Sequence, residues 1–323
     1  MNRWENKGNK PTRAGFGEGI AEAGADEPKL VILGADITAS VGLDLFKERF
    51  PERFLTLGIA EQNAMAVAAG LALAGKIPVF STYAVFAAFR AADQMRISIC
   101  YNNLHVIIGG AHAGISVGPD GATHQALEDL AIVRCLPNMT VFSPCDATQA
   151  RQAALAAVNN IHGPVYIRFG REAVPDFISE DIPFVAGQAQ VLNEGTDLTL
   201  IATGHMVWET LEASEMLASV GISARVINLH TLKPIDTETI IKAAKETGAI
   251  LTAEEHQIIN GLGSAVAEIV VRNHPVPMDF VGINDSFGES GKPSELMKKY
   301  GLTSSDIYQK ALQLYQRKKL HQP

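Results

Sequence analysis

Short, uninterrupted apolar runs recur along the chain, and segments of helix length separate them. A strand that is covered on both faces is apolar throughout, whereas a strand with one solvated face alternates. Regular alternation of covered strands with helices predicts doubly wound parallel sheets of the α/β class. In the first half, we expect strands at 30–36, 77–83, 105–111, 140–146 and 164–170, with helices at 60–74 and 147–159.

The pattern stops at 174–187, VPDFISEDIPFVAG, which carries two prolines, several acidic residues and no regular period. Such a segment is typical of a linker. The pattern then resumes, so we expect a first domain at 1–175, a linker at 176–189 and a second α/β domain at 190–323. The second domain has predicted strands at 198–204, 222–230, 249–256 and 277–283, and predicted helices at 207–219, 237–246, 262–272 and 303–317.

Composition excludes several classes of protein. With 47% hydrophobic and 19% charged residues, the chain is expected to fold around large cores. A net charge of −8 argues against non-specific binding to nucleic acid. The longest weakly polar stretch, 64–75, is too short to span a bilayer, and the N-terminus lacks the apolar core of a signal peptide. We therefore expect a cytoplasmic protein with reduced core thiols at Cys100, Cys135 and Cys145.

Glu61 opens the predicted helix 60–74, which is apolar nearly all round and is therefore expected to be buried. An acid in a first turn is favoured by the helix dipole, so a structural role is one interpretation. A buried carboxyl is also a candidate proton carrier. Tyr83, Phe86 and Phe89 follow at three-residue spacing, which places side chains near one another on a helix face. They would form either core packing or a stacking pocket for a flat heterocycle.

The segment 112–125, HAGISVGPDGATHQ, is rich in glycine and follows a predicted strand. Ligands of α/β proteins bind at loops that follow the carboxyl ends of parallel strands. His112 and His124 are candidate donors to sugar hydroxyls or phosphate, and Asp120 is a candidate acceptor, although a solvated loop is the plainer alternative. Their spacing is not that of a zinc site. Arg168 and Arg171 leave a later strand, where they would form interdomain ion pairs or a bidentate phosphate anchor.

Three motifs, in this order, resemble those of a known family. GIAEQNAMAVAAGLALAGKIPVFSTYAVF (58–86) resembles the pyrimidine-domain signature of transketolases, 1-deoxyxylulose-5-phosphate synthases and the β-subunits of 2-oxo acid dehydrogenases. GPDGATHQ (118–125) is more similar to the first two, and NLHTLKPID (228–236) resembles the shared C-terminal motif. The GDG…N motif of the diphosphate domain does not occur. The chain thus resembles the C-terminal subunit of a split transketolase that depends on thiamine diphosphate.

The resemblance implies a pyrimidine-binding domain followed by a transketolase C-terminal domain. It implies transfer of a two-carbon ketol unit from a ketose phosphate to an aldose phosphate, as in pentose phosphate metabolism. Glu61 would bond N1′ of the cofactor's aminopyrimidine and so assist loss of the C2 proton. The aromatic series ends at Ala92, where some relatives have another ring. The implied catalytic residues are Glu61, His112 and His124; the implied cofactor residues are Glu61, Tyr83, Phe86, Phe89 and Asp36; and the implied substrate residues are Arg13, Ser40, His112, Asp120, His124 and Arg171.

The same resemblance implies the partners. A separate N-terminal subunit would hold the diphosphate and most of the Mg²⁺ or Ca²⁺ site, and this chain would supply no metal ligands. Two copies of each chain would form a heterotetramer, with self-association through the pyrimidine and C-terminal domains. His205, His230 and His256 in the second domain are interpreted as structural, and dimer contacts are the role we expect for that domain.

Other functions stay open at this stage. The β-subunit of a 2-oxo acid dehydrogenase and an enzyme similar to 1-deoxyxylulose-5-phosphate synthase use the same cofactor. The two loop histidines with Asp120 favour a sugar phosphate over a 2-oxo acid. An inactive scaffolding subunit is the non-enzyme alternative, and the retained Glu61 counts against it.

Overall fold

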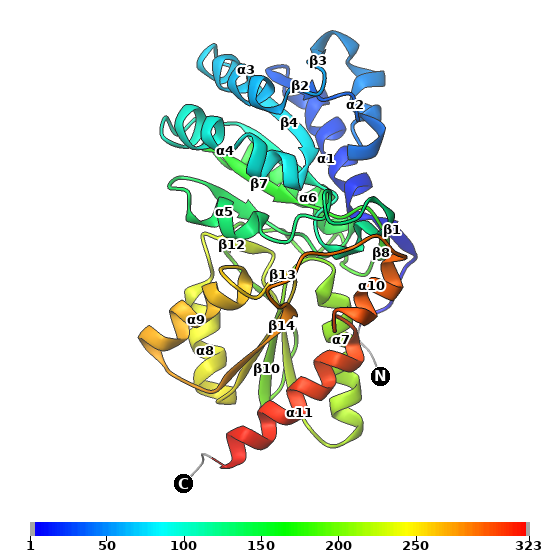
Figure 1. Cartoon of the computed structure of the whole chain (residues 1–323). Coiled ribbons are helices and arrows are strands. Elements are labelled where there is room, and N and C mark those ends of the chain that lie inside the picture. The colour runs from blue at the N-terminus through cyan, green and yellow to red at the C-terminus, as the bar shows by residue number, and fades with distance from the viewer. Residues whose placement is uncertain (1–3, 321–323) are drawn as a thin grey trace.

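The computed structural model describes residues 4–320 and contains two α/β units, one above the other in Figure 1. The upper unit is built on a seven-stranded sheet with the order β12-β6-β7-β5-β4-β2-β3. All its neighbouring strands are parallel except β12, which pairs antiparallel with β6. The strands are β2 (Leu30–Gly34), β3 (Phe54–Thr56), β4 (Ile77–Tyr83), β5 (Ile107–Ala111), β6 (Thr140–Phe142), β7 (Val165–Arg168) and β12 (Thr231–Lys233).

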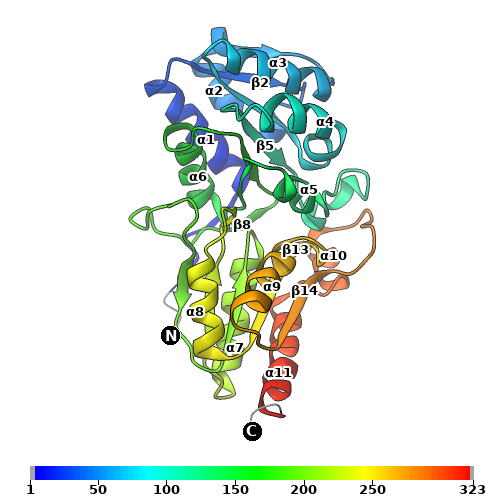
Figure 2. The ribbon, with the colours of Figure 1, turned by 90° about the vertical axis from the view of Figure 1, so that its left-hand side faces the viewer.

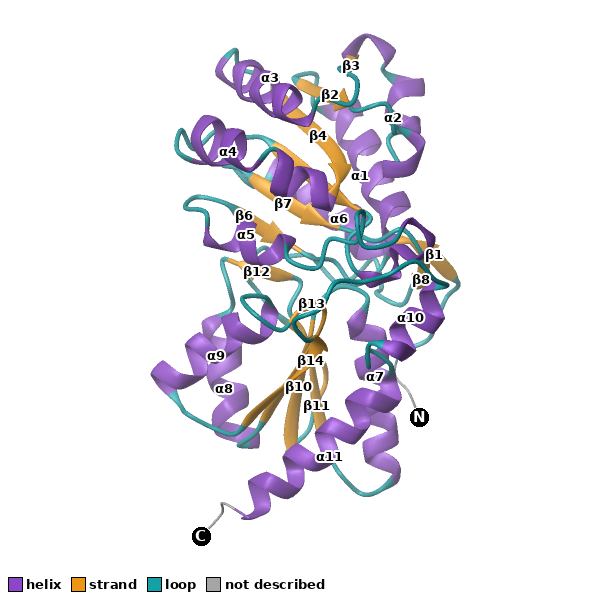
Figure 3. Cartoon of the chain, in the orientation of Figure 1, coloured by secondary structure: helices purple, strands orange, loops and turns teal. Residues whose placement is uncertain are grey.

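Helices cover both faces of this sheet, as Figure 3 shows. On one face lie α1 (Thr12–Asp26) and α6 (Ala147–Asn159), which pack against each other through small residues. On the other face lie α3 (Glu61–Leu73), α5 (Asp129–Cys135) and a segment in which α4 (Ala92–Gln94) separates two π-helical turns, η3 (Phe86–Arg90) and η4 (Met95–Cys100). The remaining elements are α2 (Asp44–Arg49) and the 3₁₀ turns η1 (Ala39–Val41), η2 (Pro51–Arg53) and η5 (Ile115–Asp120).

The lower unit has a five-stranded sheet with the order β14-β13-β10-β11-β9, in which only the edge strand β9 is antiparallel. Figure 2 shows α8 and α9 on one side of this sheet, with α7 and α11 behind it. The elements are β9 (Gln190–Asn193), β10 (Leu198–Ala202), α7 (Met206–Ser219), β11 (Ala224–Asn228), α8 (Thr237–Thr247), β13 (Ile250–Gln257), α9 (Leu262–Asn273), β14 (Met278–Ile283), α10 (Pro293–Lys299) and α11 (Ser304–Leu320).

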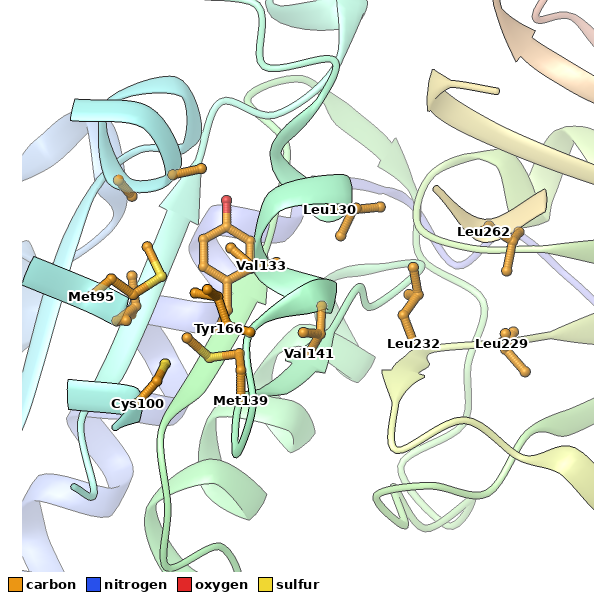
Figure 4. Close-up of a cluster of buried hydrophobic side chains, with 14 of the residues drawn as sticks. Met95, Cys100, Leu130, Val133, Met139, Val141, Tyr166, Leu229, Leu232 and Leu262 are labelled. Carbon is orange, nitrogen blue, oxygen red and sulfur yellow. The ribbon is translucent and has the colours of Figure 1, made fainter. Parts of the chain in front are cut away.

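One of the hydrophobic clusters extends across both units. Leu229 and Leu232 of the second unit pack against the same buried cluster as Val141 and Tyr166 of the first, as the close-up in Figure 4 shows. Strand β12 continues this connection, because it belongs to the second unit in sequence and to the first sheet in space. The ends of the first unit are tied together by β1 (Asn9–Pro11), which pairs antiparallel with β8 (Ala173–Pro175). The units are therefore joined by packing and pairing as well as by the chain.

The strands and helices expected from the apolar pattern are present, with shifted ends. Two edge strands were missed, and two expectations about burial were wrong. The antiparallel edge strands β9 and β12 were not expected, because short edge strands lack a long apolar run. Cys135 is exposed at the end of α5, whereas Cys100 and Cys145 are buried. Helix α3 is buried on only one side, and Leu73 on its other side is 72% exposed.

Within residues 4–320, no helix combines the length and apolar character needed to cross a membrane.

Candidate active site

The sequence-predicted site residues follow the carboxyl ends of neighbouring strands of the first sheet. Glu61 begins the helix after β3, Tyr83 ends β4, and His112 directly follows β5. Asp36 and Ser40 come after β2, and Arg171 comes after β7. Since these strands are parallel neighbours, their carboxyl ends meet at one edge of the sheet.

Glu61 is 2% exposed, and its carboxylate pairs with Arg90. The Nη1 atom of Arg90 donates to Glu61 Oε2 at 2.8 Å, while the guanidinium carbon lies 4.2 Å from the centre of the Phe86 ring. A buried carboxylate requires such a partner, because the charge has lost its solvation. Sequence reasoning missed Arg90: it stands in the run FAAFR with no motif around it, and its reach to Glu61 depends on how η3 is wound.

The aromatic series does not form one stripe. Tyr83 and Phe86 lie together, with ring centres 5.9 Å apart. Phe89 is 44% exposed and makes no ring contact within the described part of the chain. The expectation that all three rings share a helix face was wrong because η3 is π-helical. A π-helix bonds residue i to i+5 and so rotates positions three apart away from one another. Ala92 is half-buried in α4 and adds no ring.

Both loop histidines contact this aromatic pair. The imidazole of His112 stacks on Tyr83 at 4.3 Å between ring centres, and His124 meets the edge of Phe86 at 5.4 Å. His112 is 3% exposed, and neither of its ring nitrogens has a hydrogen-bond partner of good geometry within residues 4–320, although the nearby Ser40 backbone weakly opposes the fall in its pKa. It also adopts a φ of 52°, in the left-handed region that a residue with a β-carbon rarely occupies. A buried, unpartnered and strained imidazole is a candidate ligand-binding group.

Two arginines make the surroundings of His112 positive. Arg13 donates to the Ser40 carbonyl at 3.1 Å, and Arg171 pairs with Asp120 at 3.1 Å. Burial lowers the pKa of His112 to about 4, and the charges of Arg13 and Arg171 add to the effect against the opposing charge of Asp120. His112 is therefore neutral near pH 7 and offers one donor and one acceptor to a polar ligand. The arrangement suits a ligand with hydroxyls and an anionic end.

Asp36 lies at the rim of the site. Its side chain is exposed, its φ is 60°, and its Oδ2 atom lies next to Gly58 in the turn before Glu61. Among the described residues, no group of three or more His, Cys, Asp or Glu side chains is placed to hold a metal ion.

Arg168 forms an ion pair, but within the first unit rather than between the two units as expected. It is 6% exposed and pairs with Asp129 at 3.1 Å, and the Tyr166 hydroxyl donates to the same carboxylate at 2.9 Å. His230 and His256 are fully buried in the second unit, and burial lowers the pKa of each to about 4. His205 differs from them, since it is 21% exposed and lies 3.2 Å from Glu255.

Comparison with known proteins places both units in one family. Residues 9–176 match the model of the transketolase pyrimidine-binding domain, and residues 187–307 match the model of the transketolase C-terminal domain. The chain is 42% identical, over 93% of its length and 92% of the other, to the 6-deoxy-6-sulfo-D-fructose transketolase subunit SqwH of Clostridium sp.. It is 43% identical, over 94% of its length and 96% of the other, to a putative transketolase C-terminal section of Methanocaldococcus jannaschii. An apulose-4-phosphate transketolase subunit of Phocaeicola vulgatus is 39% identical over 93% of this chain and 96% of its own.

Similar solved structures are also transketolases. A split-gene transketolase described as an inactive beta4 tetramer has 51% sequence identity and a TM-score of 0.88, over 94% of this chain and 99% of that one. A transketolase from Campylobacter jejuni is 23% identical with a TM-score of 0.81 over 96% of this chain and 47% of that one, a likeness of fold. The chain belongs to the transketolase family, of which it comprises the pyrimidine-binding and C-terminal domains.

Proposed function

We propose that the chain is the C-terminal subunit of a split transketolase that moves a two-carbon ketol unit from a ketose phosphate to an aldose phosphate. The observation that carries this proposal is the pairing of two features at one sheet edge. One is the buried Glu61, which pairs with the Arg90 guanidinium that lies over the Phe86 ring; the other is the unpartnered His112 near two arginines.

The residues present fit thiamine diphosphate. When bound, the cofactor supplies the carbon nucleophile that carries the two-carbon unit. Glu61 would hold a proton at N1′ of the pyrimidine through Oε1, because Oε2 is engaged by Arg90. Tyr83 and Phe86 would lie against the ring, and Phe89 and Asp36 would contribute from the exposed rim. The Mg²⁺ or Ca²⁺ that accompanies the diphosphate would be held mainly by the partner subunit.

The loop and the two arginines would bind the substrate. Arg13, Ser40 and Arg171 would bind the anionic end, since guanidinium groups bind phosphate oxygens in pairs. Asp120 would accept from a hydroxyl. His112 and His124 would form hydrogen bonds with the hydroxyls beside the reacting carbons and would donate protons to them or accept protons from them.

A second chain would complete the enzyme. The three relatives named above are two transketolase subunits and a C-terminal section, and each is matched over more than nine-tenths of its own length. Apolar side chains stay exposed on the face that carries α3 and η4, among them Ile59, Leu73 and Tyr101 at 73%, 72% and 81% exposure. We infer that this face meets another chain in a heterotetramer with two copies of each subunit.

The experiment compares this chain alone with this chain plus an N-terminal transketolase subunit, both given thiamine diphosphate and Mg²⁺. We expect no ketol transfer from the isolated chain and turnover of a ketose phosphate from the pair. Robust activity of the isolated chain would contradict the need for a partner. If the pair consumed pyruvate and no ketose phosphate, a 2-oxo acid dehydrogenase or a synthase of the deoxyxylulose type would replace the transketolase.

A further inference from the structure

The proposed substrate loop 112–125 is held within its own unit by a few turn hydrogen bonds and by Arg171, which donates to the Val117 carbonyl and to Asp120. Gly114, Gly118 and Gly121 all have positive φ, and its longest regular piece is the 3₁₀ turn η5. A glycine-rich segment of this kind loses much conformational freedom on ordering. Contacts from outside the loop must therefore fix His112, Asp120 and His124 in position.

Glu255, near the end of β13 in the second unit, supplies the most direct of these contacts. Its Oε1 atom accepts a hydrogen bond from the backbone N–H of Ser116 at 2.6 Å. The loop lies so close to this carboxylate that a β-carbon at Gly114 would be 2.3 Å from it, so only glycine fits there. Glu255 is 5% exposed, which makes the bond one between a charged group and an amide in a dry environment.

His205 holds the other oxygen of the same carboxylate. Its Nδ1 atom lies 3.2 Å from Glu255 Oε2, and His205 directly precedes α7. The imidazole also borders a cavity of about 520 Å³ at the junction of the two units, together with Ser116, Glu209 and Lys292. His205 therefore reaches solvent on one side and the tethered carboxylate on the other.

Further bonds tie the same loop to the second unit. Gln125 donates to the Glu289 carbonyl at 2.9 Å, and Ser290 donates to the Pro119 carbonyl at 2.7 Å. The same Gln125 amide also donates to the Ile115 carbonyl within the loop at 3.1 Å. Arg168 donates to the carbonyls of both Ala126 and Glu255. The second unit thus holds the loop at Ser116, Pro119 and Gln125, and Arg168 of the first unit links the residue after the loop to Glu255.

We propose that His205 and Glu255 are positioning residues of the substrate site, which fix loop 112–125 from the C-terminal domain. The proposal rests on the proposed function and extends it, because it gives that domain a part in substrate binding besides dimer contacts. Neither residue touches substrate; both act through the Ser116 amide.

The first test measures hydrogen exchange of the full chain, which needs no activity. In Glu255→Ala we expect the amides of 113–118 to exchange faster on the order of ten- to a hundredfold, the range for a lost hydrogen bond to a charged group. Glu255→Gln keeps an acceptor for Ser116 and should give a smaller increase, as should His205→Asn. These two variants also keep the test decisive if Glu255→Ala fails to fold.

Glu254→Gln is the matched control. Glu254 is the neighbouring buried carboxylate on β13, but its oxygens accept from the amides of Leu262 and Gly263 at 2.7 and 2.8 Å and so cap α9. Its substitution should speed exchange at the start of α9 and leave 113–118 unchanged. Equal exchange of 113–118 in wild type, Glu255→Ala, Glu255→Gln and His205→Asn would overturn the tether.

The second test uses the enzyme reconstituted with its N-terminal partner. Glu255→Gln and His205→Asn should raise the KM for a ketose phosphate severalfold, with a smaller change in kcat and an unchanged affinity for thiamine diphosphate. Loosened exchange with an unchanged KM would overturn the positioning role. Absence of ketose phosphate turnover in the wild-type pair would instead overturn the proposed function, and the exchange experiment would still decide the tether.

Discussion

The carboxyl ends of β5 and β13 differ in how their polar side chains are satisfied. After β5, His112 is buried with both ring nitrogens unpartnered within the described residues. At the end of β13, the two carboxylates and the imidazole are partnered: Glu254 accepts from two amides, Glu255 accepts from one and meets His205, and the Nδ1 atom of His256 lies 2.7 Å from the Gln257 carbonyl. The amide oxygen of the Gln257 side chain is the exception, since it is buried without a partner among the described residues. Buried polar groups cost free energy unless they are bonded.

This contrast supports the proposal that the β5 end binds a ligand and that the β13 end supports it. Buried atoms without partners occur elsewhere in the structure, but His112 combines two such nitrogens with a strained backbone, a combination that is common at ligand sites. Polar side chains that have their hydrogen-bond partners instead hold the neighbouring backbone in place. Substitutions at the first end should therefore change catalysis with little loss of stability, and substitutions of the supporting groups should reduce the free energy of unfolding.

The largest effect is expected from the Asp129–Arg168 pair of the first unit, which belongs to the support because Arg168 also donates to the Glu255 carbonyl on β13 at 2.9 Å. Asp129 is fully buried and binds both Arg168 and Tyr166. Asp129→Ala leaves a buried guanidinium uncompensated, so we expect the free energy of unfolding to fall by about 3–5 kcal/mol. Urea denaturation of the full chain measures it. Glu268→Ala, which breaks the more exposed pair with Arg134, should cost no more than about 1 kcal/mol. Similar losses for the two variants would contradict the assignment of Asp129 to the support.

Glu61→Gln tests the binding end. We expect turnover of the reconstituted enzyme to fall by about a hundredfold or more, as removal of a general acid–base group does, with a smaller loss of cofactor affinity. The fold should persist, since Gln keeps the volume and still accepts from Arg90. Glu18→Gln, at a half-exposed pair with Lys10, is the control. Turnover near that of wild type would leave Glu61 as a helix-terminal acid only.

His124→Ala should act on substrate and spare the cofactor. The imidazole meets Tyr83 and Phe86 edge-on, and its Nδ1 atom lies 2.9 Å from the hydroxyl of the exposed Thr123 beside it. Loss of a hydrogen bond to a charged group predicts a fall in kcat/KM for a ketose phosphate on the order of ten- to a hundredfold. Thiamine diphosphate titration should give an unchanged dissociation constant. An equal loss of cofactor binding would place His124 at the ring instead.

Much of the fold and of the candidate binding site could be predicted from the sequence. Continuous apolar runs located the strands, and the glycine-rich segment after 105–111 located the loop with His112, Asp120 and His124. The supporting contacts could not be predicted, because Glu255 is separated in sequence from Ser116 by 139 positions and from His205 by 50. Arg90 was hidden for a local reason: propensities predict an α-helix after β4, whereas the π-helical turn sets which side chains face Glu61.

The smallest expected effect concerns the protonation of the His205–Glu255 pair. Burial alone would lower the pKa of His205, but its hydrogen bond with Glu255 and the charges of Glu255 and Glu209 outweigh burial and the opposing charge of Arg168, so the pKa lies above 6.5. Burial would likewise raise the pKa of Glu255, but His205 and Arg168 hold it below 4.5. The protonated histidine and ionised glutamate thus coexist most fully between about pH 4.5 and 6.5.

The sign of the pH dependence follows from linkage. A raised histidine pKa stabilises the fold below the unfolded value near 6.5, and this contribution is lost as pH rises through the folded pKa. A double-mutant cycle with His205→Asn and Glu255→Gln should therefore give a coupling energy on the order of 1 kcal/mol near pH 5.5 and a smaller one at pH 9. The pair Lys10–Glu18 contains no imidazole, so its coupling should stay flat over that range. Lys292 and Glu172 border the same cavity, and substituting either should leave the trend in place. A coupling energy that increased with pH would mean that the neutral imidazole is the form of His205 that binds Glu255. The second unit would then stabilise loop 112–125 more strongly at high pH than at low pH.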